Sequence, residues 1–180
     1  YNYSLETITM PNSITSILEQ SFRGCYSLIF LIVPNTVSKL TTQWLYFCYS
    51  MKAVILPNSI TSLDGQTLRD IKVNTIILPS RIQSLSGYSF DSANTLANII
   101  IPKNITSIAA SAFSSCTGMA FYDFSHHTAV PTLANTNAFT SIPSDCKIIV
   151  PDNLYDTWIA ATNWSTYAAN IIKKTDWDNL

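Results

Sequence analysis

Charge is scarce in this sequence, and long apolar runs are missing. Only 12% of the 180 residues are charged, and the formal net charge is −1. Such a chain has no basic patch to attract nucleic acid or an anionic membrane surface, so we expect no nucleic-acid partner. The longest apolar runs, such as residues 28–33, are far too short to cross a bilayer, so we expect no membrane insertion.

The residue clusters that carry chemistry are also missing. The sequence contains no GxSxG, HExxH, P-loop or dinucleotide-binding motif, and its carboxylates form no repeated pair. The only histidines are His126 and His127, which with Asp123 suggest a metal site. Neighbouring side chains usually diverge, however, and nothing nearby has ligand spacing, so we expect a solvated loop. No CxxC pair suggests structural zinc. We expect a protein without enzymatic activity, a cofactor or a metal.

Prolines, in contrast, recur with an almost constant period. Each of five prolines ends a short apolar run such as ITMP or IIIP, and the intervals between them are 23, 23, 22 and 23 residues. These prolines are Pro11, Pro34, Pro57, Pro79 and Pro102. A fixed period of this length predicts a solenoid of stacked units, each of which needs its neighbours to bury its apolar side.

Aligning the units on their prolines gives six apolar columns. In the first unit the columns begin at Leu5, Ile8, Met10, Ile14, Ile17 and Phe22. Ile8 and Met10 are two residues apart, which is the period of a β-strand. Proline cannot donate to a strand ladder and therefore ends the strand, and Pro-Asn favours a turn because asparagine tolerates a left-handed conformation.

The rest of each unit is predicted to be less regular. Ile14 and Ile17 are three residues apart, so we expect a second wall that is extended or tightly turned rather than a full strand. Residues 21–25 have the pattern of a helical or 3₁₀ turn that places Phe22 in the core.

One known repeat family has the same pattern. The motif L-x-x-I-x-I-P-x-x-I-x-x-I, followed by A/S-F-x-x-C, is clearest in residues 96–118. It resembles the BspA-like, treponemal type of leucine-rich repeat over residues 5–118, as five units, with a degenerate sixth unit from Met119. Ile71 and Ala93 depart from the motif, since they replace the cysteine. The resemblance implies a β-rich solenoid with a curved parallel sheet on one face. It also implies a surface-exposed or secreted protein that adheres to host or matrix proteins.

Three of the four cysteines fall in one repeat column. That column contains Cys25, Cys48, Ile71, Ala93 and Cys116, whereas Cys146 lies outside it. A position filled by Cys, Ile and Ala has the character of a small apolar core site. Adjacent units would bring Cys25 close to Cys48, so a disulfide between these two residues stays open.

The repeat weakens after Pro102, and the C-terminal part is predicted to be different. Met119, Tyr122 and Phe124 still fit the strand columns. Phe139 could restore the Phe column, and residues 147–151 look like a last strand with its proline. We expect the solenoid to span residues 1–151 and a helical cap to span residues 152–174. Within the cap, Asp152 would begin the first helix and Ser165 the second. Residues 175–180 would form a frayed tail, unless Trp177 folds back.

The predicted register also identifies the side chains that point outward. One outward column is Thr7, Phe30, Ala53, Thr75 and Asn98, with Phe121 as a possible sixth member; the other is Thr9, Ile32, Ile55, Ile77 and Ile100. Branched residues suit a β-ladder, which is one explanation of the four isoleucines. The other explanation is a recognition surface formed by Phe30 and these isoleucines. Its partner would be a host or matrix protein or another copy of the chain, and a glycan is also possible.

Two kinds of function fit these features. The first is a non-catalytic adhesion module of a bacterial protein that is secreted or on the cell surface. The alternative is a structural or receptor-binding part of a larger assembly, such as a phage tail or a multidomain envelope protein. The chain begins at Tyr1 without a signal peptide, and its first repeat lacks an N-terminal cap. We therefore expect a processed chain or a fragment, preceded by further repeats or another domain.

Overall fold

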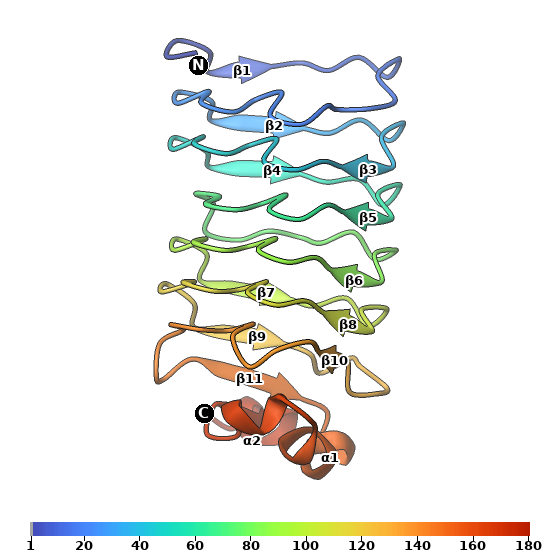
Figure 1. The fold of residues 1–180 in the computed structure, drawn as a ribbon, viewed down its shortest axis with the longest axis vertical. Coiled ribbons are helices and arrows are strands. Elements are labelled where there is room, and N and C mark those ends of the chain that lie inside the picture. The colour runs from blue at the N-terminus through green and yellow to red at the C-terminus, as the bar shows by residue number, and fades with distance from the viewer. Residues whose placement is uncertain (1) are drawn as a thin grey trace.

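The repeats stack along one long axis. The computed structural model describes residues 2–180, and in it each repeat unit forms one rung of a parallel solenoid (Figure 1). The N-terminus lies at one end of the stack, and helices α1 and α2 lie at the other. The β-rich solenoid predicted from the proline period is confirmed.

One side of the stack carries strands of two to four residues, and we call the outward surface of these strands the front face. The strands are β1 (Thr7–Ile8), β2 (Phe30–Ile32), β4 (Ala53–Ile55), β7 (Asn98–Ile100), β9 (Phe121–Asp123) and β11 (Lys147–Val150). Thr7 pairs with Phe30 and Phe30 with Ala53, so each position faces the same position of the next unit. This is the register that the prolines predict.

A second side of the stack carries strands of two residues each. They are β3 (Lys39–Leu40), β5 (Ser62–Leu63), β6 (Ser84–Leu85), β8 (Ser107–Ile108) and β10 (Thr132–Leu133). The predicted second wall therefore contains only short strands. Its position in each rung follows from the turn after the proline.

That turn has the same hydrogen bond in each of the five proline-bearing units. The amide three residues after the proline donates to the proline carbonyl, at 3.1 Å from Ile14 to Pro11 and 2.9 Å from Ile105 to Pro102. The predicted turn is present, but its asparagines do not adopt the left-handed conformation that we expected. Left-handed residues occur elsewhere in each rung.

Left-handed residues form two columns in the turns that connect one rung to the next. One column is Gln20, Gln43, Gln66, Tyr88 and Ser111, and the other is Gly24, Phe47, Asp70, Ser92, Ser115 and Ser141. This conformation costs about 1–2 kcal/mol for a residue with a side chain. It also directs the amide toward the next rung, where the amide of Ser92 donates to Ser114 O at 2.8 Å and that of Ser115 to Thr140 O at 2.7 Å. These inter-rung hydrogen bonds offset the conformational cost.

The front sheet is interrupted at the fourth rung. Strands β4 and β7 belong to separate sheets, and Thr75 between them makes only an isolated bridge to Asn98. The proline interval is 22 residues at this point, and the columns place the missing residue between Ile71 and Val73. We attribute the interruption to this missing residue, because it shortens the segment that leads into the fourth rung.

The core runs through the middle of the stack. From the second rung onward the inward columns are buried except at Leu56, whereas Leu5, Ile8 and Met10 are only partly covered because the first rung has one neighbour. Burial of one large apolar side chain contributes about 1.5–3 kcal/mol. In the Phe column, Phe113 stacks on Phe139 with ring centroids 5.3 Å apart, so the predicted return of this column is confirmed.

The C-terminal segment differs from the expected pair of helices. It consists of η1 (Asp152–Leu154), α1 (Tyr155–Ala160), η2 (Trp164–Tyr167), β12 (Ile171–Lys173) and α2 (Lys174–Asp178). The expected second helix is a 3₁₀ turn followed by a strand that pairs with β11. Neither expected cap forms, because Pro151 and Asn163 occupy the positions predicted for Asp152 and Ser165. Of the two possibilities for the tail, the structure shows the one in which Trp177 folds back, since α2 includes Trp177 and its ring lies 5.1 Å from that of Phe121.

Helix α1 and turn η2 lie across the end of the stack (Figure 1). The indole nitrogen of Trp164 donates to Pro131 O at 2.7 Å, and the hydroxyl of Tyr167 accepts from the amide of Phe139 at 3.1 Å. The buried Trp158 packs edge-on against Phe124, with centroids 5.4 Å apart. These contacts cover the end of the core with aromatic side chains.

The surroundings of Gly118 show how closely the backbones of consecutive rungs approach each other. A Cβ atom on Gly118 would overlap Asn94 O, whereas one on Gly87 would lie 3.4 Å from Ala110 O. We expect Gly118→Ala to lower the free energy of unfolding by about 2–3 kcal/mol, because backbone must move. Gly87→Ala is the control and should change it by less than about 1 kcal/mol. Urea unfolding followed by circular dichroism measures both, and equal effects would contradict the close approach of the rungs at Gly118.

Candidate functional site

The front face exposes a strip of apolar side chains. We define the isoleucine strip as Ile32, Ile55, Ile77 and Ile100, which are 51%, 50%, 87% and 57% exposed. Phe30 lies beside the start of the strip and is 37% exposed. The structure therefore places the sequence-predicted residues together on one surface. Such a contiguous apolar surface is unusual on an isolated soluble chain.

The second side of the solenoid has a different outward surface. Outward positions of its short strands are occupied by Lys39, Ser62, Ser84, Ser107 and Thr132. Both sides are built from parallel strands with the same rung spacing, so β-propensity alone would favour branched residues equally on both. The contrast shows that the isoleucines are particular to the front face.

The front face is also hollowed at the rungs where the sheet is interrupted. At the fourth and fifth rungs, Thr75, Ile77, Asn98 and Ile100 line a depression of about 380 Å³, with Ser80 and Pro102 at its margin. Ile77 is the most exposed member of the strip because the fourth rung lacks a regular strand. The lining is apolar with a few amide and hydroxyl groups, which suits an apolar side chain better than a charged one.

The strip ends where polar residues occupy its column. Thr9 precedes Ile32, and Asp123 follows Ile100 through the pairing of β7 with β9. The Asp123 carboxylate accepts from the amide of Ser125 at 2.8 Å, so it is engaged locally. The strip therefore has a defined length of four rungs, from the second to the fifth.

A second surface, which sequence reasoning missed, carries aromatic side chains on the connecting turns. Tyr3, Tyr26 and Tyr49 are spaced by 23 residues, and neighbouring ring centroids lie 4.9 and 5.6 Å apart. Arg23 and Arg69 lie over the ring of Tyr46 at 5.5 and 5.6 Å. The common spacing could have identified the tyrosine column. Its members pack on one another from rung to rung, which favours a role in stabilising the stack.

The cysteines behave as core residues. All four are free and buried, so no disulfide joins Cys25 to Cys48. The Cys48 thiol donates to Phe22 O, and the Cys116 thiol donates to Phe90 O, each at 3.2 Å. Burial raises the pKa of the Cys48, Cys116 and Cys146 thiols to about 12. These groups are therefore protonated near neutral pH and are poor nucleophiles.

The histidine loop differs from its prediction. His126 is exposed, but His127 is buried, with ring centroids 5.2 Å from Phe124 and 6.1 Å from Trp158. Neither ring nitrogen of His127 has a hydrogen-bond partner among residues 2–180. Desolvation lowers the pKa of His127, and the nearby Asp123 opposes this effect only in part. The prediction of a solvated loop is wrong for His127 because its ring fills space beneath the C-terminal cap.

Two further features concern metal binding and membrane crossing. Within residues 2–180, no three His, Cys, Asp or Glu side chains come together as metal ligands. In the same residues, every helix is too short and too polar to cross a membrane.

This parallel stack of proline-punctuated units is a leucine-rich repeat solenoid. The family model described as the BspA type leucine rich repeat region matches residues 1–120 with six copies. Because the match covers most of the chain, the protein belongs to this family. No curated protein matches it in sequence.

Solved structures share the fold at low sequence identity. A leucine rich repeat protein of Treponema pallidum matches with a TM-score of 0.53 and 13% identity, over 77% of this chain and 72% of its own. The pneumococcal vaccine antigen PcpA matches with a TM-score of 0.66 and 16% identity, over 93% of this chain. The chain corresponds to 40% of the PcpA chain. At these identities the likeness concerns the fold alone.

The pKa of His127 leads to a test by pH. Its folded pKa lies below the ordinary value of 6.5, so the unfolded chain binds the proton more readily. Stability should therefore fall as the pH drops through about 6.5. We expect the urea midpoint to decrease between pH 7.5 and pH 5.5, a range above most carboxylate pKa values.

Two variants test whether the imidazole ring of His127 causes this loss of stability at lower pH. His127→Phe should abolish most of the decrease, whereas the exposed His126→Gln should reduce it only slightly, because the charge of His126 is the smallest cause of the lowered pKa of His127. If both variants keep the full pH dependence, desolvation of His127 does not cause it.

Proposed function

We propose that this chain is a non-catalytic protein-binding module that mediates adhesion through its front face. The module would belong to a bacterial protein that is secreted or displayed on the cell surface. Its partner would be a host or matrix protein. Binding would use the isoleucine strip and Phe30, and it would require no chemical step.

The observation that carries the proposal is the difference between the two outward surfaces. Ile55 and Ile77 occupy outward positions on the front face, whereas Ser62 and Ser84 occupy outward positions of the same two units on the second side. An isoleucine side chain contributes about 1.5–3 kcal/mol to stability when it is fully buried. An isoleucine that is exposed to water therefore contributes less to folding. A partner that covers the strip would bury the exposed part of these side chains and recover a corresponding part of this free energy on binding.

Family membership supports the same proposal. Leucine-rich repeat solenoids present extended surfaces that suit protein recognition, and PcpA is described as a vaccine antigen, which fits exposure on a bacterium. The structural relatives above are bacterial proteins, so they favour the adhesion module over a phage component. The adhesive role itself is our proposal.

The proposal is tested by replacing the centre of the strip. The double variant Ile55→Thr/Ile77→Thr keeps β-branched residues at both outward positions, so the fold should persist. We expect it to weaken adhesion to immobilised extracellular-matrix proteins by at least tenfold, because two large apolar contacts are lost. Binding of purified wild-type and variant chains to a panel of such proteins, measured by biolayer interferometry, provides the comparison.

A matched control uses the same units on the opposite surface. Ser62→Thr/Ser84→Thr also introduces two threonines at outward strand positions, but away from the strip. It should bind like the wild type. Unchanged binding of the folded strip variant to every wild-type ligand would overturn the proposal, as would equal losses in both double variants.

A further inference from the structure

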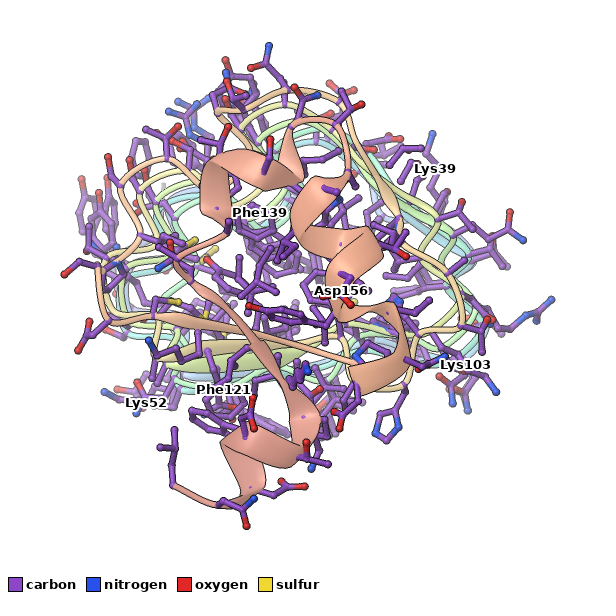
Figure 2. All side chains as sticks on the ribbon, turned by 90° about the horizontal axis from the view of Figure 1, so that it is seen from below. Lys39, Lys52, Lys103, Phe121, Phe139 and Asp156 are labelled. Atoms are coloured by element: carbon purple, nitrogen blue, oxygen red, sulfur yellow. The ribbon has the colours of Figure 1, made fainter. Side chains whose placement is uncertain are left out.

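The chain itself covers one end of the front face. Helix α2 contacts β11 and β12, and the Trp177 ring lies 5.1 Å from the ring of Phe121 on the neighbouring strand β9. In Figure 2, which looks along the stack from its C-terminal end, Phe121 projects from the sheet toward this helix. Phe121 belongs to the same outward column as Phe30 and Thr75.

Ile149 shows what this coverage does to an outward isoleucine. Ile149 pairs with Asp123, and Asp123 pairs with Ile100, so Ile149 continues the column of the isoleucine strip. Paired residues of parallel strands point to the same side of a sheet. Ile149 is only 1% exposed, whereas Ile100 is 57% exposed. The same residue at the same column position is therefore buried in strand β11, which α2 contacts.

The side chains of α2 divide into two groups. Trp177 faces the sheet and is partly buried, whereas Thr175, Asp176 and Asp178 are exposed. The Asp152 carboxylate fixes the start of the helix, because it accepts from the amide of Thr175 at 3.1 Å and from its hydroxyl at 2.5 Å. A short amphipathic helix with one indole is thus sufficient to cover this surface.

The free part of the face has room for a second ring. In the first outward column Phe30 and Phe121 carry aromatic rings, but Ala53, Thr75 and Asn98 lie between them. The depression of about 380 Å³ lies at Thr75 and Asn98, directly beside Ile77 and Ile100. An aromatic side chain from outside the chain would fill this gap in the column, as Trp177 covers Phe121.

We propose that the isoleucine strip binds a helical segment of a protein partner, and that this segment inserts one aromatic side chain into the hollow between Thr75 and Asn98. The proposal rests on the proposed function and specifies its ligand. The helix lies across the third to fifth rungs, its apolar side contacts Ile55, Ile77 and Ile100, and its polar side faces water. This is helix-in-groove recognition with a single aromatic anchor.

A stapled helical peptide that carries the α2 sequence KTDWD is the probe, and its Trp→Ala form is the control. The protein is labelled with ¹³C at the isoleucine δ1 methyl groups, and the peptides are titrated by NMR. We expect the Trp peptide to shift the methyl resonances of Ile55, Ile77 and Ile100 in a saturable manner. The resonance of Ile149 should stay unchanged, and the control peptide should bind at least tenfold more weakly.

A variant that fills the hollow provides a second, independent test of the aromatic anchor. Thr75→Phe introduces the residue that this column already holds at Phe30 and Phe121, so the fold should tolerate it. We expect this variant to weaken the Trp peptide at least tenfold, whereas Ser107→Phe on the second side leaves its affinity unchanged. Equal affinity for the wild type and Thr75→Phe would overturn the insertion of the ring.

Other occupants of the strip give different results. Stronger binding of an extended, proline-containing peptide or of an oligosaccharide than of the Trp helix would overturn the helical ligand. Concentration-dependent shifts of the same methyl groups without peptide would identify a second copy of the chain instead and would also overturn it. If the helix fails but Ile55→Thr/Ile77→Thr still loses adhesion, the proposed function stands and only the ligand is wrong.

Discussion

Stacking of one rung on the next is the constraint on which the structure depends. A single unit of about 23 residues cannot enclose its own apolar side chains, so each rung is stable only with a neighbour. The first rung illustrates this, because Ile8 and Met10 are only partly buried there, whereas Leu31 and Val33 of the second rung are almost fully buried. Stacking also holds the left-handed residues of the turns, whose amides donate to the next rung.

The same constraint produces the candidate site. Parallel pairing in a fixed register repeats the outward positions from rung to rung, and the repeat keeps Ile77 in the same column where the sheet is interrupted, so one isoleucine per unit forms a strip. The second side follows the same rule with serine, and its surface is polar. Function in such a fold depends on the choice of outward residues, because the inward residues serve the stack. The end of the front face is covered by α2, which leaves Ile149 buried and Ile100 free.

Much of this could be predicted from the sequence, because the prolines define the register and the register separates inward from outward positions. The strip, the core columns and the return of the Phe column at Phe139 follow from that. The 22-residue interval before Pro79 marks the rung in which the strand is lost, but the interval alone did not predict that loss. The cap could not be predicted in the same way, because β12 and α2 depend on packing against β11 and Phe121. His127 is buried for a similar reason, since its ring packs against Trp158, which is distant in sequence.

The exposure of individual isoleucine methyl groups tests the account most directly. A soluble paramagnetic agent broadens the resonances of ¹³C-labelled δ1 methyl groups that reach the surface. The account predicts strong broadening for Ile32, Ile55, Ile77 and Ile100, and little for the inward Ile99 or for Ile149 beneath α2. Protection of the four strip methyl groups, or broadening of Ile149 equal to that of Ile100, would contradict it.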